Sequence, residues 1–216
     1  MNKEESIYTS LCVLFSVLIV VGNLIYQKFI SLPLLPFHTF ELSVGATLYP
    51  LTFLLTDLIT EFYGKEKASF CVKLGIFMNI LVALAIMGVD QLEATAWSKV
   101  DNIIFHKVFG FYSVAFIGSV LACYISQTVD ITLYLWIRKI TEGKWLWMRN
   151  NGSTMISLFV DTFIVISFMT LFQVLPLEHM WSLIFNSYVF KLFFSFFSTP
   201  LFYICVRFMR KVILLR

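Results

Sequence analysis

The sequence predicts an all-α fold in which one domain, residues 1–216, crosses a lipid bilayer with six helices. Hydrophobic residues make up 59% of the chain and charged residues 13%, and the mean hydropathy is +0.86. A water-soluble core of this size cannot hide so much apolar surface. The apolar residues also fall into six runs, each near the roughly 20 residues with which a helix crosses hydrocarbon.

The six expected helices follow one another along the whole chain. The first apolar run is too long for a secretion signal, so we expect it to stay as a membrane span. In the second, Pro50 removes one helical hydrogen bond, which predicts a kink beside a cavity, and Gly45 permits a close neighbour. The expected spans are residues 7–26, 42–63, 68–89, 112–137, 153–175 and 181–206.

The longest break between spans, residues 90–111, mixes apolar and charged residues. This pattern predicts a cap on the outer surface that contains a short interfacial helix.

Lysines and arginines indicate the orientation in the membrane. Twelve of them fall at the two chain ends and in the second-to-third and fourth-to-fifth loops, against three in the other loops. Because positively charged loops stay in the cytoplasm, we expect both termini there.

Four charged residues lie inside the apolar runs: Asp57, Asp130, Asp161 and Lys191. Each costs roughly 2.5 to 3.5 kcal/mol at the centre of a bilayer. Such residues usually face a polar pathway or a binding site between helices. We therefore expect Asp57, Gln127, Asp130, Asp161 and Lys191 to approach one another around a central cavity in the cytoplasmic half.

Glu61 shares a helix face with Asp57, because the two residues are four positions apart. Two interpretations stay open for it: a gating or proton-coupling role, or a solvated helix end near Lys65 and Lys67. Lys191 has two interpretations as well, a ligand for the solute or an internal counter-ion of the acids.

The polar groups indicate the kind of solute. A carboxylate only accepts hydrogen bonds and suits a planar edge with two adjacent N–H groups, as in a guanine-type ring. Gln127 and Asn186 can both donate and accept. From chemistry alone, the sequence predicts binding of a small polar or cationic solute.

Other function classes lack their motifs. No G-x-S-x-G, H-E-x-x-H or phosphate-binding G-x-x-x-x-G-K-[ST] occurs, so no catalytic, metal or cofactor site is expected. The four cysteines are scattered singly, and the net charge of +3 does not favour nucleic acid. The energy source stays open between a coupling ion and an energising partner protein, and so does assembly into a homo-oligomer.

Four blocks, in order, carry a resemblance: Y-P-L-T-F-L-L-T-D-L-I-T-E-F-Y-G-K, then Q-T-V-D, then M-R-N-N-G-S-T-M-I-S-L-F-V-D-T, and finally Y-V-F-K. Together they resemble the bacterial queuosine precursor transporter family, also called the vitamin uptake transporter family. Membership implies an inner-membrane permease of six spans that imports 7-deazaguanines (preQ0, preQ1 or queuine) for transfer-RNA modification. The family's polar motif positions correspond to Asn23, Asp57, Gln127, Asp130, Asp161 and Lys191.

With the resemblance, the expected substrate-binding set gains an aromatic residue, Tyr188 or Phe190, that stacks on the ring. The family often has Gln or Asn where this chain has Leu158, which leaves the preferred 7-deazaguanine open. The alternative function is a substrate-binding membrane subunit of an energy-coupled vitamin importer. The full expected binding set is Asn23, Asp57, Gln127, Asp130, Asp161, Asn186, Tyr188 and Lys191.

An internal repeat is also a hypothesis. Thr52-x4-Asp57 in the second span echoes Ser157-x3-Asp161 in the fifth, as two inverted three-helix halves would require.

Overall fold

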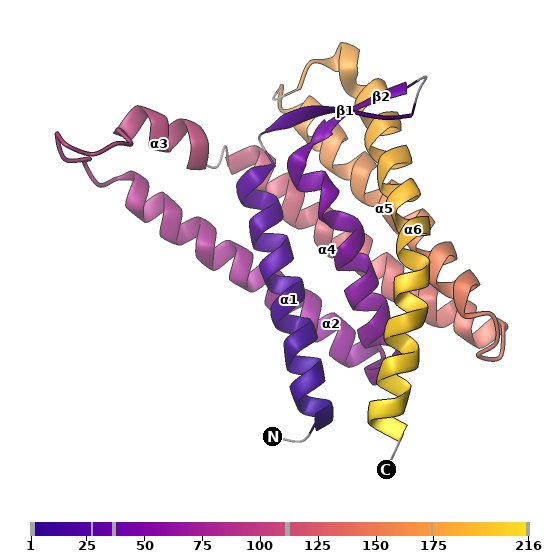
Figure 1. Cartoon of the computed structure of the whole chain (residues 1–216). Helices are drawn as coiled ribbons and strands as arrows, with labels where there is room; N and C mark the ends of the chain where they lie inside the picture. Colours follow the sequence, from indigo (N-terminus) through magenta and orange to yellow (C-terminus); the bar gives the residue numbers. More distant parts are fainter. Residues whose placement is uncertain (1–2, 27, 36–37, 111–112, 174, 215–216) are drawn as a thin grey trace.

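Long helices run between two ends of the molecule, with a β-hairpin at one end and both chain termini at the other (Figure 1). The computed structural model of the chain describes residues 3–26, 28–35, 38–110, 113–173 and 175–214. The elements are α1 Lys3–Ile25, β1 Phe29–Leu35, β2 His38–Ser43, the 3-10 turn η1 Val44–Thr47, α2 Tyr49–Asp90, α3 Asn102–Phe109, α4 Ser113–Ile140, α5 Leu146–Leu171, the 3-10 turn η2 Leu177–His179 and α6 Met180–Leu214.

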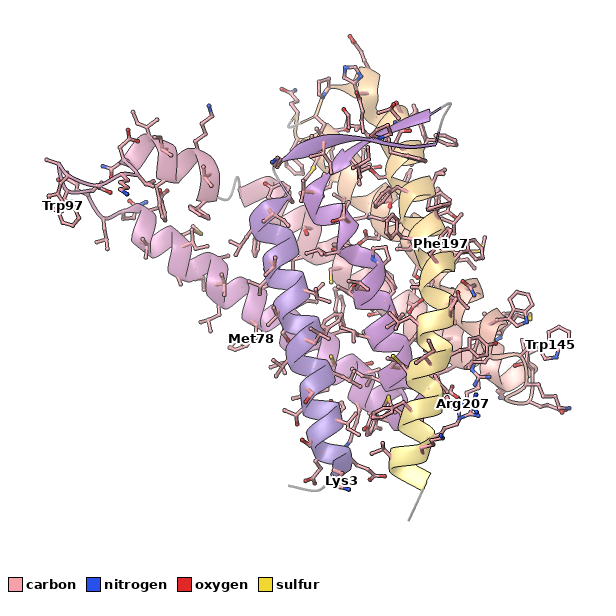
Figure 2. The ribbon with its side chains drawn as sticks, viewed as in Figure 1. Lys3, Met78, Trp97, Trp145, Phe197 and Arg207 are labelled. Atoms are coloured by element: carbon pink, nitrogen blue, oxygen red, sulfur yellow. The ribbon has the colours of Figure 1, made fainter. Side chains whose placement is uncertain are left out.

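Among the described residues, five helices are long and apolar enough to cross a membrane: α1, α2, α4, α5 and α6. The prediction of a helical protein that crosses the membrane several times is therefore confirmed. Many large apolar side chains on these helices are exposed, as Met78 on α2 illustrates (Figure 2). In a bilayer such side chains face lipid.

α2 is one long element with a break at Gly64, where φ is 80° and ψ is −177°. This backbone conformation is essentially restricted to glycine. The first arm runs from the hairpin toward the chain termini, and the second arm runs back toward α3 (Figure 1). The expected second and third spans thus lie mostly on the two arms of α2.

Several element ends differ from the prediction. Pro50 lies in the first turn of α2, where its missing N–H needs no partner, so it begins the helix instead of kinking it. The kink expected at Pro50 is wrong, and the break comes at Gly64. α5 begins at Leu146, well before residue 153, and α6 continues to Leu214. The expected start of the fourth span, residue 112, lies outside the described residues.

The hairpin was not predicted. β1 and β2 pair antiparallel, and Phe40 and Leu42 of β2 pack with Phe190 of α6 in a small apolar cluster. The break expected to cap the bundle does contain a helix, α3, but α3 lies against the end of the second arm of α2, where His106 pairs with Asp90, and Trp97 points away from the bundle (Figures 1 and 2). The hairpin, and not α3, covers the helix ends.

Small residues let the helices approach closely. A Cβ atom at Gly45 would collide with the carbonyl oxygen of Gly22 on α1, and one at Gly118 of α4 would lie 2.7 Å from the ring of Phe168 on α5. Membrane helices often pack through such residues. The tight approach of Gly45 to its neighbour was predicted and is confirmed.

Candidate functional site

The charged residues of the apolar runs are buried between helices and do not face the surroundings. Asp130 and Asp161 are 0% exposed, Asp57 is 1% exposed, and Lys191 is 5% exposed. They come from four helices, α2, α4, α5 and α6. Gln127 of α4 and Asn23 of α1 are buried as well.

Asp161 and Lys191 form an ion pair between α5 and α6. The distance from Lys191 Nζ to Asp161 Oδ2 is 2.8 Å. Lys191 also donates to Thr162 Oγ1 at 3.2 Å, and its ammonium lies 4.7 Å from the ring centroid of Tyr49. The pair thus presents a donor, an acceptor and an aromatic face side by side.

This pair lines a cavity between α1, α2, α4, α5 and α6 at their hairpin-side halves. The space open to the centre of a water molecule is about 100 Å³. A single water needs about 10 to 15 Å³ of such space, so the cavity has room for a small solute. Its polar lining residues are Asn23, Tyr26, Ser43, Tyr49, Ser119, Asp161, Thr162, Ser187 and Lys191.

Asn23 reaches the cavity from α1 and is held by α4. Ser119 donates to Asn23 Oδ1 at 2.7 Å. This contact orients the amide in the wall of the cavity opposite the α5 and α6 residues.

α4 and α5 exchange two serine-to-aspartate hydrogen bonds. Ser157 of α5 donates to Asp130 Oδ1 at 2.8 Å, and Ser126 of α4 donates to Asp161 Oδ1 at 3.3 Å. In each helix the serine and the aspartate are four residues apart, so they lie on one face. The two S-x3-D segments therefore bind each other reciprocally across the helix pair.

A second polar cluster lies further along α2, beyond the cavity. Its residue Asp57 follows the cavity residue Tyr49 by eight positions, which corresponds to a rise of about 12 Å along the helix. The carboxyl group of Asp57 lies beside that of Asp130. Next to them, Gln127 accepts from Thr56 at 2.8 Å and donates to Thr52 at 3.3 Å. Asp57, Asp130 and Gln127 are not lining residues of the cavity, so the structure divides the expected single constellation into two neighbouring sites.

Glu61 begins a third cluster, one turn beyond Asp57. Its carboxylate binds Arg149 of α5 at 2.7 Å and lies 3.7 Å from Arg138 of α4 and 3.6 Å from Arg210 of α6. Tyr134 donates to the same carboxylate at 3.0 Å. One buried glutamate thus ties four helices together at the end of the bundle that carries the termini.

These contacts correct the expected surroundings of Glu61. Its partners are arginines of other helices and not Lys65 and Lys67, and its side chain is only 6% exposed. The interpretation as a solvated helix end is therefore wrong.

Three further residues proposed from sequence also lie outside the cavity. Tyr188 donates to the carbonyl of Met155 at 3.3 Å, and its ring packs edge-on against Phe159. Phe190 packs in the hairpin cluster with Phe40. Asn186 is buried and donates to Ser182 at 3.5 Å.

Sequence reasoning missed Tyr49, Ser119, Ser126 and Arg149 as parts of these clusters. Arg149 was counted only as a charge in a loop, yet it is 1% exposed inside α5. Ser126 could have been found, because the S-x3-D spacing of α5 recurs in α4.

The sequence matches, over residues 43–205, the profile of a family described as "Putative vitamin uptake transporter". The chain belongs to the vitamin uptake transporter family. It is also 31% identical over 161 residues to a protein of Bacillus subtilis (strain 168) named "Probable queuosine precursor transporter", a match that spans 73% of this chain and 69% of the relative. No solved structure matches the chain.

The resemblance inferred from the four sequence blocks is thus confirmed, and this vitamin uptake transporter is a transport protein rather than an enzyme. Among its described residues, no group of three or more His, Cys, Asp or Glu could hold a metal ion. The cavity of the transporter offers hydrogen-bonding groups of both kinds and an aromatic face. Those groups suit a planar, polar solute.

Proposed function

We propose that this transporter imports queuosine precursors, 7-deazaguanines such as preQ0, preQ1 or queuine, and that they bind in the cavity of Asp161 and Lys191. The observation that carries the proposal is this ion pair at the cavity wall, 2.8 Å from Nζ to Oδ2. The name of the Bacillus subtilis relative points to the same class of solute.

The pair complements the edge of a guanine-type ring. That edge offers two adjacent N–H donors next to a carbonyl acceptor. The Asp161 carboxylate can accept from the two donors, and the Lys191 ammonium can donate to the carbonyl. Both protein groups are charged, so each hydrogen bond is of the stronger, charge-assisted kind.

Tyr49 takes the stacking role in this proposal. Its ring lies 4.7 Å from Lys191 Nζ and lines the cavity, whereas Tyr188 packs on Phe159 and Phe190 packs on Phe40. Asn23, held by Ser119, supplies a further hydrogen-bonding group from the opposite wall. Tyr49 thus takes the place of Tyr188 or Phe190, whereas Asn23, Asp161 and Lys191 are kept from the binding set expected from sequence.

Glu61 is assigned to gating. The ion pairs of Glu61 join α2, α4, α5 and α6 on the terminus side of the cavity. A solute that leaves toward that side has to pass between these helices. The network therefore has to open for release and to close again before the next cycle.

The proposed topology is one domain of six spans, with each arm of α2 as a separate span and both termini in the cytoplasm of the bacterial inner membrane. The position of both termini at one end of the bundle and the reversal of α2 at Gly64 support it (Figure 1). The twelve-to-three distribution of lysines and arginines supports the orientation.

The test is complementation in bacterial cells that lack both their own route to 7-deazaguanines and their own importer. We expect expression of this protein alone to restore queuosine in transfer RNA when preQ0, preQ1 or queuine is supplied at limiting concentration. The Asp161→Asn variant should lower the rate of restoration about tenfold or more, because a charge-assisted hydrogen bond contributes roughly 1.5 to 3 kcal/mol.

Two results decide between the alternatives. Failure of the intact protein to restore queuosine with any of the three precursors would contradict the proposed function. Restoration that requires a co-expressed energising protein would instead favour the substrate-binding subunit of an energy-coupled importer.

A further inference from the structure

The carboxyl groups of Asp57 and Asp130 meet in the interior of the bundle with an incomplete set of hydrogen-bond donors. Ser157 donates to one oxygen of Asp130. Both oxygens of Asp57 and the second oxygen of Asp130 are buried and accept no well-aligned hydrogen bond from the described residues, although the side chains of Ser153 and Thr154 lie close to them. Three unsatisfied carboxyl oxygens at 0% and 1% exposed residues call for a ligand that donates or carries positive charge.

The cations around this carboxyl pair are bound elsewhere. Lys191 of α6 is paired with Asp161 of α5. On the other side, Glu61 of α2 takes the three arginines that approach from α4, α5 and α6, which are Arg138, Arg149 and Arg210.

The remaining neighbours of the carboxyl pair are neutral. Tyr134 of α4 directs its hydroxyl group to Glu61, and Ser153 and Thr154 of α5 lie beside the pair. α1 packs on the opposite side of α2, against Leu55 and Ile59. Its titratable groups Tyr8 and Cys12 approach Cys71 and Lys67 on the second arm.

Two ionised carboxylates side by side in such an environment repel each other strongly, and pairs of this kind share a proton. A shared proton also supplies the missing donor, because the protonated carboxyl can donate to its neighbour. The geometry therefore fits a carboxyl pair that holds one proton better than two ionised carboxylates.

We infer that Asp57 and Asp130 form the coupling site of the transporter, where one proton binds and is carried inward together with each substrate molecule. The inference rests on the proposed function for its substrate. In each cycle the pair takes up one proton from the outer side and releases one proton to the cytoplasm, and no other bond is made or broken.

The substrate cavity and the proton site are joined by the reciprocal bonds of α4 and α5. Ser126 and Asp130 share a face of α4, and Ser157 and Asp161 share a face of α5. A change at Asp161 when substrate binds can therefore reach Asp130 by two parallel routes, each made of one hydrogen bond and one turn of helix. The substrate cavity and the proton site are thus only one helical turn apart along α4 and along α5.

The test uses the purified full chain in liposomes with labelled preQ0, which is uncharged at neutral pH. With the membrane potential clamped, a pH gradient that is alkaline inside should drive accumulation of roughly tenfold per pH unit for one proton per substrate. A pH-sensitive dye trapped inside should report entry of one proton for each preQ0.

Asp57→Asn and Asp130→Asn keep the shape of the pair and remove its exchangeable proton. Each variant should retain exchange of labelled for unlabelled preQ0 across the membrane and lose accumulation driven by the pH gradient. The matched control is Asp101→Asn, at an exposed residue that caps α3 by accepting from Ile104, a role that asparagine also fills. This control should accumulate preQ0 like the unchanged protein.

The outcomes separate the two proposals. If the unchanged protein exchanges preQ0 but accumulates it only with a sodium gradient, or without proton entry, the coupling inference is wrong and the proposed function stands. Accumulation by both Asn variants in response to the pH gradient would also overturn it. If no exchange occurs with preQ0, preQ1 or queuine, the proposed function fails and the inference fails with it.

Discussion

Removing one partner of the Asp161 and Lys191 ion pair should destabilise the protein far more than removing both. At 2.8 Å and an effective dielectric constant of about 20, the attraction between the two charges is about 6 kcal/mol. Desolvation offsets much of it, but a single substitution leaves the other charge buried and unpaired, which typically costs about 3 to 5 kcal/mol. We therefore expect Asp161→Asn and Lys191→Met each to lower the stability of the protein by about this amount. The double variant should be almost as stable as the unchanged protein.

The assay is thermal unfolding of the four proteins in the same lipid nanodiscs. For a chain of this length, 1 kcal/mol corresponds to roughly 2 to 4 °C, so each single variant should melt roughly 6 to 20 °C below the unchanged protein. The double variant should melt close to the unchanged protein but remain inactive in transport, because both substrate-facing charges are gone. A double variant that melts as low as the sum of the two single losses would refute the view that the charges stabilise each other.

The other predictions concern the gate and the glycines. Glu61→Gln should destabilise by about 3 to 5 kcal/mol, because Arg149 then lies buried without its carboxylate; an unchanged melting temperature would show that the arginines find other partners. Gly45→Ala should cost about 1 to 3 kcal/mol, because its methyl group would collide with the Gly22 carbonyl, and melting like the unchanged protein would contradict this packing. Gly64→Ala meets no atom within 4 Å but forces a side chain into a glycine conformation, so it should also cost about 1 to 3 kcal/mol. Gly88→Ala, which lies in the same long helix with open space around its Cβ position, is the control for both and should be neutral or slightly stabilising.

The burial of the charged residues could be predicted from sequence, because the cost of a charge against lipid leaves few alternatives. Asp57, Asp130, Asp161 and Lys191 all lie inside the bundle for that reason. Their division into two sites could not be predicted. It depends on the rotation of each helix about its axis, which places Asp161 against Lys191 and Asp57 against Asp130.

The hairpin and the break in α2 are two further features that could not be predicted from the sequence. The sequence predicts a loop between the first two spans, whereas β1 and β2 pair there and β2 packs against Phe190, a residue far away in the chain. Pro50 and Gly64 both read as helix breakers, but only their place in the helix decides their effect. Proline is tolerated in a first turn, and glycine at a positive φ interrupts a helix.

Equilibrium binding of labelled preQ0, preQ1 and queuine to the purified protein in nanodiscs tests most directly whether 7-deazaguanines bind at Asp161 and Lys191. We expect the unchanged protein and Asp101→Asn to bind at least one of the three with the same affinity. Asp161→Asn should bind that precursor at least about tenfold more weakly, in proportion to a lost charge-assisted hydrogen bond. Equal affinity of Asp161→Asn and the unchanged protein would contradict the assignment of the cavity as the substrate site.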